Sequence, residues 1–279
     1  MAEDRKKLIE VQDLVVRFGS RRHAFTAVDN VSFHIYQGET FGLVGESGSG
    51  KTTIGRAIIR IHPTAGGKIL FDGKQINGRI SKALDREVTQ RIQMIFQDPF
   101  SSLDPRMSVS QIIEEPMRLH GMYKSSHERE TQTLKLMDTV GLARRLYNTY
   151  PHELDGGRRQ RIGIARALSL NPKFIVCDEP VSALDVSIQA QILNLMQDLQ
   201  DEFHLTYMFI THNMSVVKHI SNNIMIMYLG NMVEFAGAEE IFKNRLHPYT
   251  KALLAAVPIP AIIEAVSYTH LRAHETPEH

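Results

Sequence analysis

The stretch Gly45-Glu46-Ser47-Gly48-Ser49-Gly50-Lys51-Thr52 decides the fold. It satisfies the pattern G-x-x-x-x-G-K-[ST], in which glycines let backbone N–H groups wrap around a phosphate. The short run Glu39 to Val44 before it is typical of a strand, and Thr52 to Ile61 after it is typical of a helix. A flexible glycine-serine linker is the alternative, but a linker would not place a lysine and two hydroxyls at the start of a helix.

The residue types of this loop predict a distinct role for each side chain. Lys51 would reach the β- and γ-phosphates of a nucleotide, Thr52 would hold Mg²⁺, and Thr53 would contact a phosphate oxygen. The N-terminus of the following helix would add partial positive charge. We therefore expect residues 45–53 to form a nucleotide phosphate site.

A second candidate element is the apolar run Phe174-Ile-Val-Cys177, which is followed by two acids, Asp178 and Glu179. In open α/β sheets, chemistry takes place at the carboxyl ends of buried strands. Asp178 would then complete the Mg²⁺ shell, and Glu179 would polarise an attacking water. The alternative is a pair of solvated loop acids, and Cys177 is expected to be a core residue.

His212 follows a similar buried run, Tyr207 to Ile210. It is one of 13 histidines, and a lone histidine is usually structural. By itself this position therefore carries only a weak functional prediction.

The rest of the pattern predicts an α/β core with a helical insertion. The first 40 residues resemble β-structure, and Lys68 to Phe71 is expected to be an edge strand. Helices are expected around 108–120 and 126–140, from Gly157 to about Leu170, and from Val186 to Phe203.

Composition limits the function classes. The chain has 279 residues, 32 basic and 31 acidic, so bulk nucleic-acid binding, which needs a basic face, is not expected. The single cysteine excludes a disulfide framework and a multi-cysteine zinc site. The apolar run Ala252 to Ile263 contains Pro258 and Pro260 and is too short to span a bilayer.

The ordered set of motifs resembles the ATP-binding subunits of ABC transporters, and within them the peptide-importer (oligopeptide/dipeptide) group. The motifs are the Walker A loop, a glutamine loop at Phe96-Gln97-Asp98-Pro99, a signature-like segment at Leu154 to Arg158, Walker B at Phe174 to Glu179, a D-loop at Ser182-Ala-Leu-Asp185 and a switch histidine, His212. Ser101-Ser-Leu-Asp-Pro105 and His247-Pro-Tyr-Thr-Lys251 resemble the peptide-importer branch.

The resemblance implies an α/β fold with a P-loop RecA-like core, an N-terminal antiparallel β subdomain and an inserted α-helical subdomain. The ATP-binding domain would cover residues 8–260, with the helical subdomain over 98–165. In the family's pattern, Phe18 would stack on adenine, Gln97 would sense the γ-phosphate and contact the metal, and Asp185 would lie at a dimer contact. Glu179 and His212 would act together on the attacking water.

The signature segment departs from the family's usual Leu-Ser-Gly-Gly-Gln, because here it is Leu154-Asp155-Gly156-Gly157-Arg158. Asp155 still suits a helix N-cap, but its carboxylate would face the phosphate of ATP bound to a partner subunit. At ~4 Å and an effective dielectric constant near 20, that repulsion is about 4 kcal/mol. Arg158 could offset the repulsion by pairing with Asp155 or by touching the phosphate.

The resemblance also implies the partners and cofactors. ATP and Mg²⁺ would bind between two ATP-binding subunits, and the altered signature favours a heterodimer. Two transmembrane permease subunits and, indirectly, an extracytoplasmic solute-binding protein would complete an importer at the cytoplasmic face of the membrane, with no nucleic acid. The alternatives are compensation between Asp155 and Arg158, a catalytically weak, nucleotide-gated regulatory subunit, and a soluble ABC-type ATPase acting on DNA or ribosomes.

The segment 264–279 fits none of these patterns. It contains His270, His274 and His279 without a supporting pattern, and Val266 to Thr276 resembles translated sequencing adapter. We expect it to be non-native, disordered and without function, in place of the C-terminal extension usual for peptide-importer ATPases.

Overall fold

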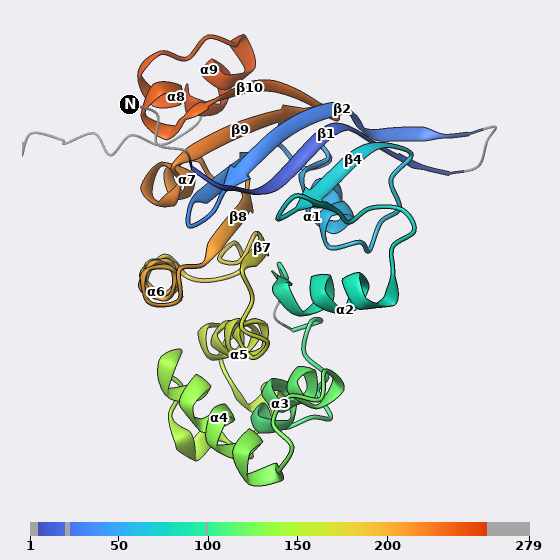
Figure 1. The fold of residues 1–279 in the computed structure, drawn as a ribbon. Helices are drawn as coiled ribbons and strands as arrows, with labels where there is room; N and C mark the ends of the chain where they lie inside the picture. Colours follow the sequence, from blue (N-terminus) through green and yellow to red (C-terminus); the bar gives the residue numbers. More distant parts are fainter. Residues whose placement is uncertain (1–4, 20–22, 99, 256–279) are drawn as a thin grey trace, which may run out of the picture.

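Two β-sheets pack on either side of helix α1 (Lys51–Ile58) in this computed structural model, which describes residues 5–19, 23–98 and 100–255 (Figure 1). The smaller sheet is antiparallel, with strand order β2-β1-β4-β5. Its strands are β2 (Phe25–Tyr36), β1 (Lys7–Phe18), β4 (Gly66–Phe71) and β5 (Lys74–Gln75). Their inward-facing aliphatic side chains share one apolar cluster with Ile54 and Ile58 of α1.

The larger sheet has the order β10-β9-β3-β8-β7-β6. From β9 to β6 all neighbouring strands are parallel, and β10 joins β9 antiparallel. The strands are β3 (Thr40–Val44), β6 (Ile92–Ile95), β7 (Phe174–Asp178), β8 (Thr206–Thr211), β9 (Asn223–Tyr228) and β10 (Asn231–Gly237). Every residue of β3, β7 and β8 is buried, as expected for parallel strands covered on both faces. Their carboxyl ends therefore meet at one edge of the sheet.

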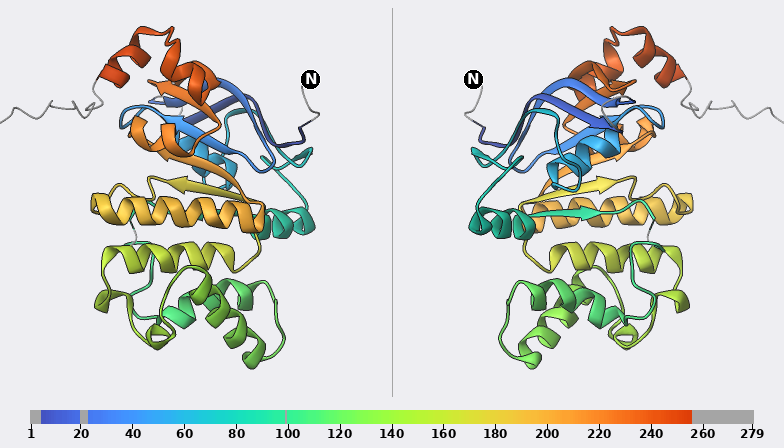
Figure 2. Two further views of the ribbon diagram at one scale, coloured as in Figure 1. Left: turned by 90° about the vertical axis from the view of Figure 1, so that its left-hand side faces the viewer. Right: turned by 90° about the vertical axis from the view of Figure 1, so that its right-hand side faces the viewer.

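Helices α3 (Val109–Leu119), α4 (Ser126–Thr139) and α5 (Gly156–Leu168) gather at the end of the molecule away from the antiparallel sheet (Figures 1 and 2). Two 3₁₀ helices, Arg144–Leu146 and Pro151–Glu153, connect α4 to α5. Capping boxes at Ser108 and Ser125 fix the starts of α3 and α4. Their apolar faces join α6 (Val186–Phe203) and β7 in a second cluster.

The C-terminal part of the described chain packs on the β9 side of the larger sheet. Helices α7 (Met214–Ile220), α8 (Ala238–Lys243) and α9 (Pro248–Ala255) form a third apolar cluster there.

The remaining helix, α2 (Lys82–Arg91), directly precedes β6. Among the described residues, no helix is both long and apolar enough to cross a membrane.

The structure confirms most of the elements expected from the sequence and corrects one. The helix Val186–Phe203 has its expected bounds, and the helix expected from Gly157 to Leu170 runs from Gly156 to Leu168. Lys68 to Phe71 is not an edge strand, because β4 lies between β1 and the two-residue β5. The sequence pattern does not predict β5, because it has only two residues. It pairs with β4 only at Leu70 and Phe71. The expected boundary at 260 and the tail at 264–279 lie outside the described residues.

Candidate functional site

The glycine-rich loop joins β3 to α1 and has a backbone that only glycine adopts easily. Gly45 has φ +155°, and a Cβ there would lie 2.2 Å from the Met227 carbonyl oxygen. Gly50 is the N-cap of α1 with φ +100°, and a Cβ there would lie 2.5 Å from the Ala27 carbonyl oxygen. The loop thus packs closely between β2 and β9, where only glycine leaves enough room. Its N–H groups lie at the N-terminus of α1, a position that favours binding of an anion.

Lys51, the first residue of α1, is held against this loop. Its Nζ donates to the Glu46 carbonyl oxygen at 2.7 Å and to Ser49 Oγ at 3.4 Å, and the residue is only 5% exposed. Burial lowers the Lys51 pKa, although the charges of Glu179 and Asp178 oppose that shift. A poorly solvated ammonium at the mouth of an N–H-lined loop is a ready partner for a phosphate.

Thr52 and Asp178 meet across the site. Thr52 Oγ1 donates to Asp178 Oδ1 at 2.8 Å, and Asp178 is the buried last residue of β7. Burial raises the Asp178 pKa, opposed in part by the Thr52 hydrogen bond. A hydroxyl and a carboxylate are the oxygen ligands that Mg²⁺ prefers, with phosphate and water oxygens completing its shell. Among the described residues no group of three or more His, Cys, Asp or Glu side chains could hold a metal alone.

Glu179 is the meeting point of three strand ends. Its Oε2 accepts from Gln97 Nε2 at 3.0 Å, and its Oε1 lies 3.1 Å from His212 Nδ1. Gln97 follows β6, Glu179 follows β7 and His212 follows β8. Glu179 has a positive φ of 45°, and its N–H donates to the Ile210 carbonyl at 2.9 Å, which turns the side chain out of the strand direction.

The surroundings of Glu179 suit a proton acceptor. The Glu179 side chain is 15% exposed, whereas His212 is 59% exposed. The carboxylate is therefore largely shielded from solvent without being fully buried. Two partners fix its orientation, as a general base requires. The structure thus brings Gln97, Glu179 and His212 together, with Asp178 next to Glu179.

We expect Asp178→Asn to stabilise the protein in the absence of nucleotide. The raised Asp178 pKa means that the folded state favours the neutral carboxyl, so ionisation at a pH above 3.8, the ordinary pKa of an aspartate, costs stability. At pH 7 the melting temperature should rise by roughly 2–4 °C, or about 1 kcal/mol. Thermal unfolding measures this. The advantage should shrink as the pH falls toward 3.8, and a melting temperature that drops at pH 7 would contradict it.

Phe18, expected to stack on adenine, is the last residue of β1 and is 38% exposed. Its ring packs edge-to-face on His62, with centroids 5.0 Å apart. The neighbouring strand β2 approaches the loop through Ala27. The stacking role remains a prediction.

The signature segment lies apart from the glycine-rich loop, at the start of α5 (Figures 1 and 2). Asp155 is the N-cap, and its Oδ1 accepts from the Arg158 N–H at 2.8 Å, which confirms the expected cap. Arg158 Nη1 pairs with Asp155 Oδ2 at 2.7 Å, with both side chains half exposed. A Cβ on Gly156 would lie 3.1 Å from Leu184, and one on Gly157 2.8 Å from Ile188. This segment therefore packs beside the D-loop, where Asp185 is the exposed N-cap of α6.

Sequence reasoning missed one residue of the loop's surroundings. The Glu46 N–H donates to the Tyr249 hydroxyl at 3.0 Å, from helix α9 more than 200 positions along the chain. In the sequence, the run His247 to Lys251 only resembles the peptide-importer branch. No local pattern links it to the loop.

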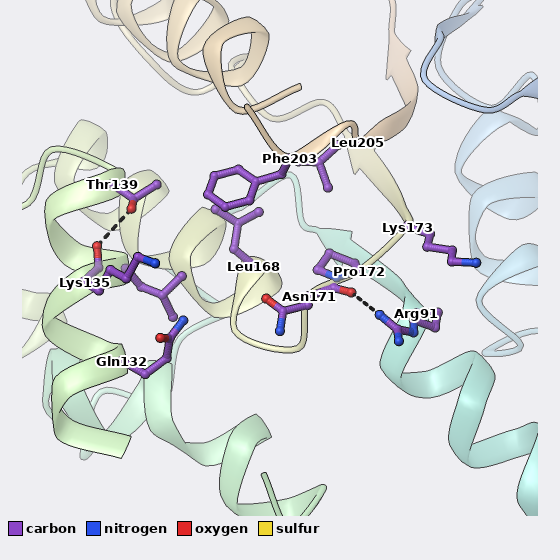
Figure 3. A pocket seen from close by; sticks show the side chains of 11 residues that line it. Arg91, Gln132, Lys135, Thr139, Leu168, Asn171, Pro172, Lys173, Phe203 and Leu205 are labelled. Carbon is purple, nitrogen blue, oxygen red and sulfur yellow. Dashed lines mark hydrogen bonds between the residues drawn. The ribbon is translucent and has the colours of Figure 1, made fainter. Parts of the chain in front are cut away.

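A separate cavity of about 290 Å³ lies between α4, the turn after α5 and the end of α6 (Figure 3). Its apolar floor includes Leu168, Phe203 and Leu205, and Lys135 and Arg91 reach its rim. Arg91 donates to the Asn171 carbonyl at 2.9 Å. No residue of the phosphate loop or of the Glu179 cluster lines this cavity, so it is not part of the candidate site.

Two family models match the chain: "ABC transporter" over residues 28–182, and "Oligopeptide/dipeptide transporter, C-terminal region" over 233–277. The second match overlaps the segment 264–279, for which a non-native origin stays a prediction. The oligopeptide transport ATP-binding protein OppF of Bacillus subtilis is 53% identical over 91% of this chain and 84% of its own length. The oligopeptide transport ATP-binding protein AmiF of Streptococcus pneumoniae is 53% identical over 91% of this chain and 83% of its own.

Solved structures agree with these matches. An ATP-binding cassette in a dimeric post-hydrolysis state, bound to ADP and Pi, has a TM-score of 0.74 at 26% identity and covers 83% of this chain and 99% of its own. The protein cbiO1 from Clostridium perfringens, part of an ABC transporter complex, has a TM-score of 0.75 at 25% identity and covers 86% of this chain and 92% of its own.

Proposed function

This chain belongs to the ABC transporter family of ATP-binding proteins, and on that premise we propose that it hydrolyses ATP to power an importer of oligopeptides or dipeptides. The observation that carries the proposal is the convergence of Gln97, Glu179 and His212 beside the Thr52–Asp178 pair. The names of its relatives support the peptide substrate.

In this proposal the loop N–H groups and Lys51 hold the β- and γ-phosphates, and Thr53 contacts a phosphate oxygen. Thr52 and Asp178 would hold Mg²⁺, with Gln97 as a further candidate ligand, and the ion would neutralise charge on the phosphates. Glu179 accepts a proton from the attacking water, and His212 orients that water and the γ-phosphate. Gln97 links this cluster to the helical region that begins at residue 98.

We further propose that ATP binds between two such subunits. Support comes from the separation of the chain's own signature segment from its own glycine-rich loop. Asp155, Gly156, Gly157 and Arg158 would complete the site of a partner, and Asp185 would lie at the contact. The unusual Asp155 favours a heterodimer, in which the partner supplies an ordinary signature to this chain's loop.

A permease segment would dock beside Gln97. An open groove of about 250 Å³ lies between the end of α1, α2, β6 and Pro116 of α3, and it is lined by Ile59, Ile61 and Phe96. It lies beside the residue before Gln97, so a helix of a permease seated there could sense the site. Two permeases and an extracytoplasmic solute-binding protein would complete the importer, with this chain peripheral at the cytoplasmic face and no nucleic acid involved.

Ile61→Asp tests the docking groove. Ile61 is 54% exposed, so the change costs the fold little, but it places a charge where an apolar permease helix would sit. We expect peptide uptake to fall by about tenfold while ATP turnover without permeases stays within about twofold. Lys82→Asp, an exposed change at the start of α2, is the matched control. Equal uptake by Ile61→Asp and wild type would contradict this docking site.

Reconstitution tests the function as a whole. The chain, its partner ATPase and the permeases would be placed in vesicles with the solute-binding protein and a labelled oligopeptide. We expect uptake that requires hydrolysable ATP and stops when this chain is omitted. Uptake that proceeds without the chain, or ATP turnover that no peptide or permease affects, would refute the importer role.

A further inference from the structure

Two C-terminal elements contact the phosphate loop. The β9–β10 turn contacts it through Gly230, whose N–H donates to the Ser49 carbonyl at 3.1 Å. Helix α9 contacts it through Tyr249, whose hydroxyl accepts the Glu46 N–H at 3.0 Å. Figure 1 shows α9 and β10 together at the same end of the molecule. A segment far from the loop in sequence therefore forms one wall of it.

Tyr249 is itself firmly held. Its ring packs on Tyr228 of β9, with centroids 4.6 Å apart. The start of α9 is tied to β10 by Glu234, whose carboxylate accepts the Leu246 N–H at 3.0 Å, the His247 N–H at 3.2 Å and the Thr250 hydroxyl. The packing of the Tyr249 ring and the hydrogen bonds at the start of α9 therefore fix the position of the Tyr249 hydroxyl.

Glu46 connects Tyr249 to Lys51, the lysine that is expected to bind the phosphates. Its carbonyl oxygen accepts Lys51 Nζ at 2.7 Å and the Ser49 N–H at 3.2 Å. Glu46 therefore makes both contacts: its N–H, in the peptide group before it, donates to Tyr249, and its carbonyl oxygen, in the peptide group after it, holds Lys51. A shift at Tyr249 would move the lysine that is expected to meet the phosphates.

We propose that Tyr249 is a positioning residue for nucleotide binding, which acts through Glu46 on the loop and on Lys51. The inference rests on the proposed ATP site. Glycine-rich backbone is costly to order, and a loop already held in shape has less conformational entropy to lose when the phosphates bind. The region matched by the oligopeptide/dipeptide C-terminal model would then serve the ATP site directly, through one hydroxyl.

Tyr249→Phe removes that hydroxyl and keeps the ring on Tyr228. We expect the Kd for MgATP, measured by calorimetric titration of the full chain, to rise by about 2- to 10-fold, the value of one hydrogen bond. The kcat at saturating ATP, measured with the partner ATPase present, should stay within about twofold, because Tyr249 touches no reacting atom. Tyr228→Phe is the matched control and should bind as the wild type does.

Each result decides the proposal. A Tyr249→Phe Kd equal to that of the wild type overturns it, and so does an equal loss in Tyr228→Phe, since the effect would then not be specific to the Tyr249 hydroxyl. A loss of kcat without a change in Kd also overturns it. If the wild-type chain binds no ATP, the proposed function fails first. Thermal unfolding of both variants shows that the fold is intact.

Discussion

Replacing Glu179 by glutamine is expected to lower kcat for ATP by about 10²- to 10⁴-fold, the range typical of a lost general base. Glutamine keeps the size of the side chain and one acceptor oxygen for Gln97, but it cannot take a proton from water. The phosphate loop, Lys51 and Thr52 are untouched. The Kd for ATP should therefore stay within about threefold of the wild-type value. Phosphate release at saturating ATP and a nucleotide titration measure the two quantities.

A matched glutamate provides the control for this result. Glu202 is exposed near the end of α6, away from the site, and Glu202→Gln should leave kcat unchanged. If Glu179→Gln retained more than about a tenth of the wild-type kcat, another group would have to accept the proton, and His212 is the next candidate. A large loss of ATP affinity would instead mean that the variant disturbs the loop.

The parts of the site that lie close in sequence could be predicted from residue types alone. The glycine-rich loop needs positive φ angles that only glycine adopts easily, and Gly45 and Gly50 are both held against neighbouring carbonyl oxygens. The run Phe174 to Cys177 is apolar throughout because β7 is covered on both faces, and Asp178 and Glu179 follow at its carboxyl end. Each of these features therefore depends only on residues that are neighbours in the sequence.

The parts that join distant segments could not be derived that way. Gln97 is predicted only by resemblance to a family, and His212 carries only a weak prediction from its position after a buried run, because nothing in either segment's own pattern says that both side chains meet Glu179. Tyr249 is not predicted as part of the site, because the run that contains it only resembles the peptide-importer branch and a tyrosine at the start of a helix is ordinary. Tertiary hydrogen bonds between separate elements depend on the packed sheet order, which local spacing does not encode.

The role of Arg158 in the signature segment also could not be derived from the sequence. The sequence left two roles open for Arg158, and in the structure it pairs with Asp155 at 2.7 Å while both side chains stay half exposed. An exposed pair is worth little to stability, about 0–1 kcal/mol, so a nearby phosphate could still draw Arg158 away. The pair nevertheless places a positive charge next to the carboxylate that would face ATP on a partner.

Asp155→Ser is expected to raise ATP turnover at the partner's site, provided that site is isolated from this chain's own. A background carrying Glu179→Gln isolates it, because the remaining turnover then comes from the site that this chain's signature completes. Uncompensated repulsion of about 4 kcal/mol corresponds to roughly a thousandfold, which is the upper bound for the gain. If Arg158 neutralises the Asp155 carboxylate, the gain in turnover falls toward a few-fold. The size of the gain therefore measures how strongly the Asp155 charge repels the phosphate.

Arg158→Gln and the double variant Asp155→Ser, Arg158→Gln complete the cycle. Removing Arg158 alone leaves Asp155 unpaired, so we expect the lowest turnover there, while the double variant restores the family's usual residues and should be the most active. Phosphate release by the chain mixed with its partner ATPase measures all four combinations. With Glu179 intact, the chain should show little turnover without that partner. High turnover by the chain alone, together with a loss on Asp155→Ser, would refute the heterodimer and make Asp155 and Arg158 a working signature.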